Sequence, residues 1–204
     1  RSPSRGLGDV YKRQDIGRIL VGFSVLFTGM MMMGESVEPL KDSPSFSHIL
    51  TAFNNPLVGV LAGAIITAVI QSSAASIGIL QSLSITGHIT YGMAIPIIMG
   101  QNIGTCVTAL ISSIGVNRSA RRVAVIHIAF NCIGTIILLP ILYLVNAFVD
   151  FVFMDWTISY AGIALVHTIF NVVVTFLLLP FSKLLEKLAY PVSYTHLRAH
   201  ETDS

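Results

Sequence analysis

The chain has 204 residues, of which 53% are hydrophobic and only 11% are charged, and its mean hydropathy is +0.77. Soluble domains carry about 25% charged residues, so this composition excludes a soluble enzyme and a nucleic-acid-binding protein. No Asp, Glu, Lys or Arg occurs in the 75 residues from Ser43 to Asn117, whereas one membrane-spanning helix needs about 20 residues. We therefore expect an all-α, polytopic membrane helical bundle.

The two ends of the chain look foreign to the rest. Asp9–Gln14 can be written in codons whose reverse complement, read in a shifted frame, encodes Val192–His196. Ends encoded by opposite strands of one oligonucleotide resemble translated adapters from DNA library preparation. We therefore expect residues 1–14 and 192–204 to be adapter-derived. The transmembrane unit is then 15–191, and the natural protein is expected to be longer.

The first predicted elements are a spanning helix and a short amphipathic helix. Ile16–Gly34 is an apolar run with Arg18 near its start, and it predicts a spanning helix. A polar loop with Pro39 and Pro44 follows. An apolar stripe at helical spacing then predicts a short helix along the membrane interface, formed by Phe46, Ile49, Leu50 and Phe53.

Two longer apolar runs are interrupted by polar residues. Leu57–Thr86 contains Gln71–Ser76, and Tyr91–Ile114 contains Gly100–Thr105. A break inside the bilayer is tolerated only where protein or a water-filled cavity surrounds it. Glycines let the backbone turn, and half-helix ends offer N–H groups to an anion and carbonyls to a cation. We expect two broken or re-entrant helices whose interruptions form one binding site, as in secondary transporters.

Two further apolar runs, Val123–Phe148 and Ile158–Leu179, share a repeated sequence pattern. Polar groups in membrane helices face the bundle interior. The shared polar face therefore either forms hydrogen bonds between helices or contacts a substrate. The repeated positions are His127, Asn131, Thr135 and Pro140 in the first run, and His167, Asn171, Thr175 and Pro180 in the second.

Charged residues around these two runs predict their orientation. Basic residues lie before the first run and after the second, and acidic residues lie between the runs. The positive-inside rule puts the basic ends in the cytoplasm and the acidic loop outside. The basic residues are Arg118, Arg121, Arg122, Lys183 and Lys187, and the acidic ones are Asp150 and Asp155.

The interrupted runs resemble the type II sodium–phosphate cotransporter family. Thr67–Ser76, Pro96–Leu110 and Asn117–Arg122 carry the likeness, which spans nearly all of the chain between the expected adapters. The family's hallmark is a Gln-Ser-Ser-Ser motif in each of two inverted repeats. Here the third serine is Ala74, and Ser76 lies on a different helical face. The single motif is more similar to the second repeat of bacterial members, so the resemblance implies a first repeat upstream.

This resemblance implies sodium-coupled symport of inorganic phosphate across the bacterial cytoplasmic membrane, by a multi-pass protein with sodium as coupling ion and no organic cofactor. The implied partners are the lipid bilayer, the first repeat and a cytoplasmic helical regulatory domain toward which Phe181–Tyr190 leads, without nucleic acid. The implied site contains Gln71, Ser72, Ser73, Gln101, Asn102, Thr105 and, one turn before Gln71, Thr67. Sodium is expected at Ser72, Ser73, Asn102 and Thr105.

Three other functions compete with this interpretation. Uncharged breaks alone do not indicate which anion is transported, so symport of another oxyanion or of a carboxylate stays open. A non-transporting membrane scaffold also stays open, and in it the polar breaks would only pack helices. An enzyme is not expected, because the histidines are scattered and a serine without a nearby base is a poor nucleophile. Cys106 and Cys132 lie in apolar runs and are expected to be buried thiols.

Overall fold

A computed structural model describes the backbone of residues 3–115 and 118–190, and side chains from residue 13 onward within them. The expected adapter segment 192–204 and Asn117 lie outside the described residues. Within the described part the chain is helical, apart from turns and one isolated bridge. Four helical segments are long and apolar enough to cross a membrane, which confirms the expected all-α, multi-pass architecture. They are Arg13–Leu40, Tyr91–Ser112, Arg118–Val149 and Tyr160–Ala189.

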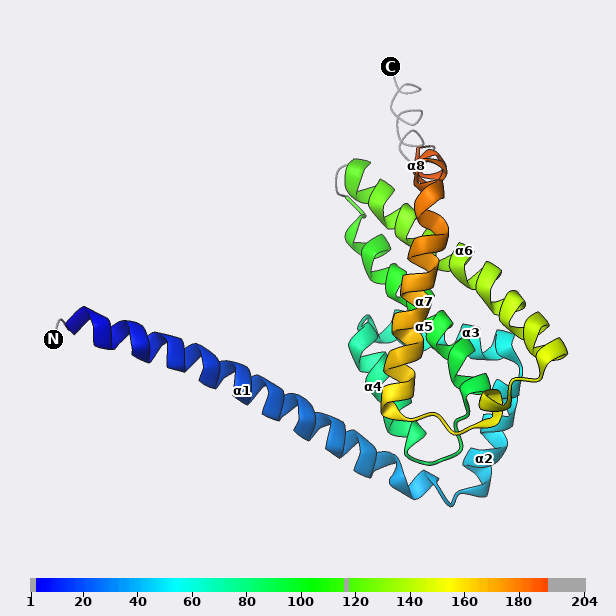
Figure 1. Cartoon of the computed structure of the whole chain (residues 1–204), viewed down its shortest axis with the longest axis horizontal. Helices are drawn as coiled ribbons and strands as arrows, with labels where there is room; N and C mark the ends of the chain where they lie inside the picture. The colour runs from blue at the N-terminus through cyan, green and yellow to red at the C-terminus, as the bar shows by residue number, and fades with distance from the viewer. Residues whose placement is uncertain (1–2, 116–117, 191–204) are drawn as a thin grey trace.

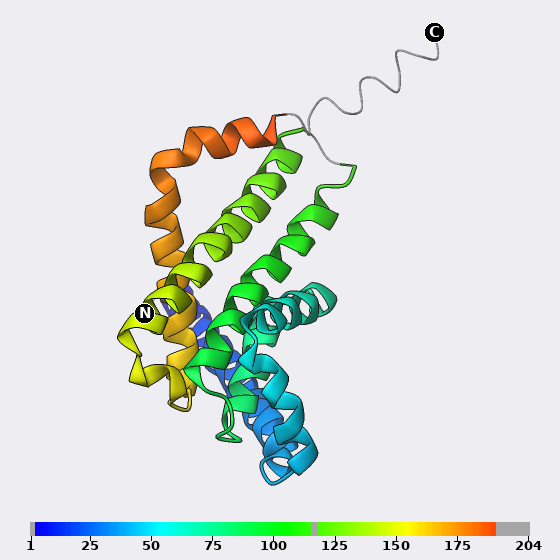
Figure 2. The ribbon, with the colours of Figure 1, turned by 90° about the vertical axis from the view of Figure 1, so that its right-hand side faces the viewer.

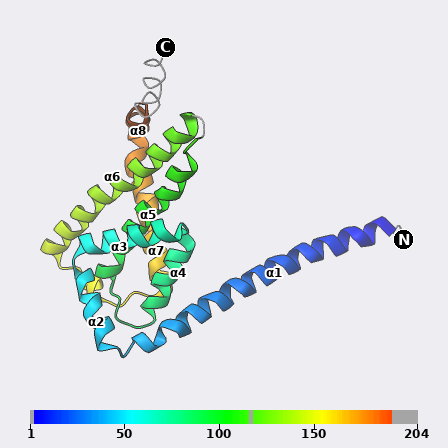
Figure 3. The same cartoon turned by 180° about the vertical axis from the view of Figure 1, so that it is seen from behind.

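Helix α1 (Pro3–Val37) contains the spanning helix predicted over Ile16–Gly34. Figures 1 and 3 show α1 reaching away from the other helices, and none of its apolar window is buried. Its carboxyl-terminal part touches the bundle, where Met33 and Gly34 lie against α4 (Ser73–Ser84) and the residue that follows it. The apolar sides of α1 are therefore available to lipid or to other parts of a larger protein.

The predicted amphipathic stripe forms α2 (Pro44–Leu50) and η2 (Thr51–Asn54), after a short turn η1 (Glu38–Leu40). The segment bends by 108° into α3 (Pro56–Ile70), so the pair is either a broken span or a re-entrant loop. Three of the four residues of its apolar stripe pack into the bundle, and the fourth, Ile49, is exposed. Leu50 is buried, and Phe46 and Phe53 pack partly buried against the same core.

The interruption predicted at Gln71 is a true break between α3 and α4. Gln71 has a left-handed backbone conformation with φ of 56°. At a helix end this conformation is most often adopted by glycine. Ser72 then caps α4, because its hydroxyl accepts a hydrogen bond from the backbone N–H of Ala75 at 3.3 Å. Figure 3 shows α4 turning away from α3 at this point.

The interruption predicted at Gly100–Thr105 is wrong, because α5 (Tyr91–Ser112) runs through it as a continuous helix. The polar side chains there bond to carbonyls of their own helix. The Asn102 amide donates to the carbonyl of Ile98 at 2.9 Å, and the Thr105 hydroxyl donates to the carbonyl of Gln101 at 2.8 Å. These local bonds satisfy the side chains without opening the helix.

Pro96 lies inside α5 and removes one backbone hydrogen bond, because proline has no N–H. The carbonyl that loses its donor is that of Gly92, four residues earlier. The Tyr143 hydroxyl, from the neighbouring α6 (Arg118–Val149), donates to this carbonyl at 2.9 Å. A side chain from another helix thus replaces the missing backbone bond.

Glycines hold the backbones of α3 and α5 in direct contact. The spacing is Gly59-xxx-Gly63 in α3 and Gly100-xxx-Gly104 in α5, which puts each pair on one helical face. A Cβ atom added at Gly63, Gly100 or Gly104 would overlap a carbonyl oxygen of the other helix. Small residues at four-residue spacing are the usual means of close helix packing in membranes.

The carboxyl-terminal part of the chain contains the two echoing runs. They form α6 and α7 (Tyr160–Leu178), joined through η3 (Val152–Asp155). A turn η4 (Leu179–Phe181) leads to α8 (Ser182–Ala189), which crosses the beginning of α6 (Figure 2). One apolar core lies around α4, α5 and α7, and a second joins α5, α6, α7 and α8.

We predict opposite effects of an added methyl group at two helical glycines. Gly100→Ala should destabilise the protein by about 1–3 kcal/mol, because the new methyl overlaps the α3 backbone. Gly22→Ala meets no atom within 4 Å and should leave stability unchanged or raise it by about 1 kcal/mol, since alanine favours a helix. Thermal unfolding of both variants in detergent measures the difference. Equal effects would contradict the close contact between α3 and α5.

Candidate functional site

Three buried polar side chains join the broken helix to α5. The Thr67 hydroxyl, at the end of α3, donates to the Ser76 hydroxyl of α4 at 2.7 Å. The Gln101 amide of α5 donates to both the hydroxyl and the carbonyl of Ser76, each at 2.9 Å. The exposed fractions of Thr67, Ser76 and Gln101 are 0, 1 and 4%. The break is therefore held against α5 by hydrogen bonds that no solvent reaches.

The other end of the Gln101 amide has no partner within the described part of the chain. Its Oε1 atom is buried and accepts no hydrogen bond there, although leaving such an atom unpaired costs about 1–3 kcal/mol. Gln101 also lines a small, mostly apolar cavity of about 60 Å³ between α2, α3, α4 and α5, in which Ser76 is the other polar lining residue. A carbonyl oxygen at a small cavity can accept from water or ligate a hard cation.

The predicted motif Gln71-Ser72-Ser73 forms the outer rim of the break. The Gln71 side chain is exposed, and Ser72 and Ser73 are half-buried. Neither Gln71 nor Ser73 makes a side-chain hydrogen bond to another described residue. The N–H groups of Ser73 and Ala74 open α4, so no carbonyl one turn earlier accepts from them. The rim thus offers hydroxyl, amide and N–H donors together.

Asn102 and Thr105 lie on other faces of α5. Asn102 turns toward α7, where the Asn171 amide donates to its Oδ1 atom at 3.2 Å. Thr105 is half-buried and donates within its own helix. Among the described residues no hydrogen bond joins Gln71 to Asn102. The structure therefore brings Thr67 and Gln101 to the break through Ser76, and it turns Asn102 toward a different neighbour.

The asparagines of the repeated pattern form hydrogen bonds between helices. The Asn131 amide of α6 donates to the Cys106 sulfur at 3.3 Å, and the Asn171 amide of α7 donates to Asn102. Asn102 and Cys106 lie one turn apart on α5. Each asparagine also donates to the carbonyl of the histidine four residues earlier in its own helix. The repeat thus gives α6 and α7 equivalent contacts with successive turns of α5.

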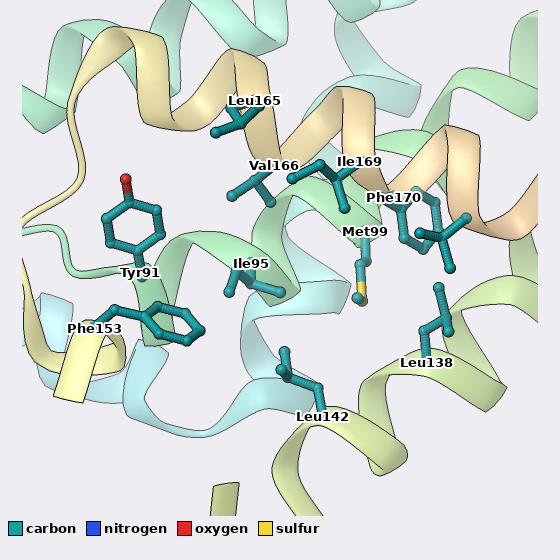
Figure 4. A pocket seen from close by; sticks show the side chains of 11 residues that line it. Tyr91, Ile95, Met99, Leu138, Leu142, Phe153, Leu165, Val166, Ile169 and Phe170 are labelled. Atoms are coloured by element: carbon teal, nitrogen blue, oxygen red, sulfur yellow. The ribbon is translucent and has the colours of Figure 1, made fainter. Parts of the chain in front are cut away.

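An apolar cavity of about 360 Å³ lies between α5, α6 and α7 (Figure 4). Its lining is almost entirely hydrocarbon, so it offers an inorganic anion hardly any hydrogen-bond donor. This cavity is therefore not the site for a charged substrate. Side chains that line it include Tyr91, Ile95, Met99, Leu138, Phe153 and Phe170.

Comparison with known proteins bears on the broken helix and its surroundings. The sequence pattern of the Na+/Pi-cotransporter family matches residues 25–166. The chain belongs to this family. The match covers α2 to α6 and includes every predicted site residue. This membership confirms the resemblance found in the sequence, and the family is one of transporters rather than of enzymes.

Several curated proteins are similar to the chain over most of its length. "Uncharacterized protein YqeW" of Bacillus subtilis is 30% identical over 141 residues, which are 69% of the chain and 46% of that protein. "Sodium-dependent phosphate transport protein 2B" of Homo sapiens is 34% identical over 139 residues, 63% of the chain and 20% of that protein. "Putative inorganic phosphate export protein YjbB" of Escherichia coli is 25% identical over 130 residues, 63% of the chain and 24% of that protein.

The chain thus spans less than half the length of these relatives in the Na+/Pi-cotransporter family. No solved structure matches it.

We predict that Ser76 carries much of the stability of the break. Ser76→Ala removes the acceptor of Thr67 and one acceptor of Gln101, so it should lower the free energy of unfolding by about 1–3 kcal/mol. The control Thr168→Ala removes an exposed hydroxyl that donates within α7, and its effect should stay within about 0.5 kcal/mol. Thermal unfolding compares the two. A Ser76→Ala effect no larger than that of Thr168→Ala would contradict the polar link.

Proposed function

We propose that the complete protein couples sodium to the symport of inorganic phosphate and that this chain supplies one of two inverted repeats. The observation that carries the proposal is the break at Gln71–Ser72, which lies inside the match to the Na+/Pi-cotransporter family. The name of the human relative, a sodium-dependent phosphate transport protein, supports phosphate as the substrate. Residues 1–14 and 192–204, which lie outside the family match, are proposed to be adapter-derived.

The proposed phosphate site is the amino-terminal end of α4. Phosphate oxygens accept hydrogen bonds, and the rim offers the Gln71 amide, the hydroxyls of Ser72 and Ser73, and the N–H groups of Ser73 and Ala74. The helix dipole adds partial positive charge at this end. Ala74 lacks the hydroxyl of the family motif, and Ser76 does not replace it, because its hydroxyl is buried between Thr67 and Gln101.

Sodium is proposed to bind beside the phosphate. The last carbonyls of α3 have no helical donor and carry partial negative charge, and they lie next to the positive end of α4. Side-chain oxygens complete the proposed ligand set. In it Thr67 and Gln101 hold the break, and the Gln101 Oε1 atom is buried without a partner among the described residues. The proposed side-chain ligands for sodium at the break are Ser72 and Ser73. Asn102 and Thr105, also expected from the sequence, lie on other faces of α5.

The direction of net transport is a separate question. The name of YjbB describes phosphate export, whereas that of the human relative describes sodium-dependent transport. A symporter runs with the combined gradient of its two ions, so imposed sodium and phosphate gradients separate the two activities. Symport of another oxyanion or a carboxylate predicts competition of that anion with phosphate. A scaffold predicts no flux at all.

We predict that Gln71→Ala and Ser73→Ala each reduce sodium-dependent phosphate flux to background in vesicles that contain the complete protein. Each change removes a rim group that makes no side-chain hydrogen bond to a described residue, so membrane expression should be retained. The control Thr175→Ala removes an exposed hydroxyl that donates within α7, and it should transport normally. Radiolabelled phosphate measures the flux. Normal flux in both rim variants would remove these residues from the site.

The charges at the two ends of the bundle predict its orientation. Hydrogen bonds tie the loops around Lys41, His88 and Trp156 together at one end, and the described residues near that end are mostly acidic. The Arg121 end carries mostly basic residues, so the positive-inside rule makes it cytoplasmic. The acidic end contains Glu35, Glu38, Asp42, Asp150 and Asp155.

We therefore predict that Asp150→Cys reacts with a membrane-impermeant thiol reagent from outside the cell and that Arg121→Cys does not. Cys106 and Cys132 are first replaced by serine so that only the introduced thiol reacts. Permeabilised cells should label both positions, which controls for access. The reverse pattern in intact cells would overturn the orientation.

A further inference from the structure

Helix α8 follows α7 after the short turn η4. α7 has 19 residues, and at about 1.5 Å for each residue it is as long as the hydrocarbon core of a bilayer is thick. Pro180 then lies in the turn η4, and α8 leaves the direction of α7 to cross the first turns of α6 (Figure 2). If the span ends with α7, α8 lies at the membrane surface.

The side chains of α8 form three separate strips. Leu185 and Ala189 are buried against the bundle, with exposed fractions of 7 and 0%. A second strip is apolar yet exposed, and a third holds Lys183 and Lys187, one turn apart. Helical spacing sets the lysine strip to one side of the exposed apolar strip. The exposed apolar residues are Leu184 and Leu188 of α8 and Phe181 at the end of η4, with exposed fractions of 57, 50 and 54%.

The neighbouring start of α6 adds positive charge to the same surface. The Arg122 guanidinium stacks over the Tyr190 ring at 4.3 Å from its centroid, which ties α6 to the end of α8. Glu186 is the one acidic residue of α8 and of the first turns of α6 in the described chain, and its carboxylate accepts from the Tyr190 hydroxyl at 3.2 Å. The basic residues of this surface are Arg118, Arg121, Arg122, Lys183 and Lys187.

We propose that α8 and the first turns of α6 form a docking surface for anionic phospholipids. The apolar strip inserts among the upper acyl chains, and the lysines and arginines bind headgroup phosphates. A strip of large apolar side chains flanked by basic residues matches the anionic surface of a membrane. A free phosphate ion would leave Phe181, Leu184 and Leu188 without a partner, so the lipid is the occupant that satisfies both strips. This proposal does not depend on the transported substrate.

Tryptophan quenching by brominated lipids tests the proposal in the complete protein in vesicles. Trp156 is the single tryptophan of this chain. With it, and any tryptophan elsewhere in the complete protein, replaced by phenylalanine, Leu184→Trp and Leu188→Trp serve as two reporters on the apolar strip. Both should be quenched by tail-brominated lipid, and more strongly when the bromine is on phosphatidylglycerol than on phosphatidylcholine. The matched control Glu186→Trp, on the solvent side of α8, should be quenched little by either lipid.

Charge variants then identify the headgroup contact. Lys183→Gln with Lys187→Gln should weaken the preference for phosphatidylglycerol by about fivefold for each lysine, whereas the pair changed to arginine should keep it. Added inorganic phosphate at the same ionic strength should not compete. Absence of quenching at both reporters, or equal quenching by the two lipids, would overturn the proposal. The proposal would also be overturned if the preference for phosphatidylglycerol survived the two glutamine substitutions, or if inorganic phosphate abolished it.

Discussion

Direct contact between the backbones of α3 and α5 is the constraint on which the rest of the structure depends. Lipid tails are as apolar as leucine side chains, so helices in a bilayer associate through close packing and hydrogen bonds rather than by escaping water. Four glycines allow the two backbones to meet. This contact brings Gln101 within reach of Ser76, and through Ser76 of Thr67. The inner side of the break, at Thr67 and Ser76, is thereby covered by protein, whereas its rim at Gln71 is exposed. Irregular backbone at membrane depth is tolerated where protein or a water-filled cavity surrounds it.

The sequence predicted one of the two interruptions correctly because the two stretches use small and polar residues differently. Gln71–Ser76 contains no glycine, and its serines cap and begin a new helix. Gly100–Thr105 contains two glycines four residues apart, a spacing that also suits one face of an unbroken helix. The composition of this second stretch predicted a turn, whereas its spacing favours helix packing. The glycine pair of α3, against which an unbroken helix can pack, is about forty residues away in the sequence, so the local sequence does not show whether a turn or a helix forms.

The site was predictable in its residue types and only partly in its arrangement. Gln71, Ser72 and Ser73 lie at the break because their local sequence creates it. Gln101 and Asn102 are adjacent, and helical geometry turns them about 100° apart, so one reaches Ser76 and the other Asn171. The repeated His-Asn-Thr pattern predicted a shared polar face, but the neighbour of that face depends on tertiary packing. Ser76 differs from the rim serines because its helical position points it toward α5.

Under the proposed function, coupling between the two ions follows from the neutrality of the site. The break offers dipoles and neutral oxygens from Gln71 to Ser76, and no charged residue lies within thirty residues of Gln71 in the sequence except Asp42 and Lys41. Two opposite unit charges about 4 Å apart attract by about 4 kcal/mol at an effective dielectric constant near 20. Each ion would therefore raise the affinity for the other, and this effect is reciprocal. A fixed arginine at the rim would bind phosphate without sodium and so remove the reason for coupling.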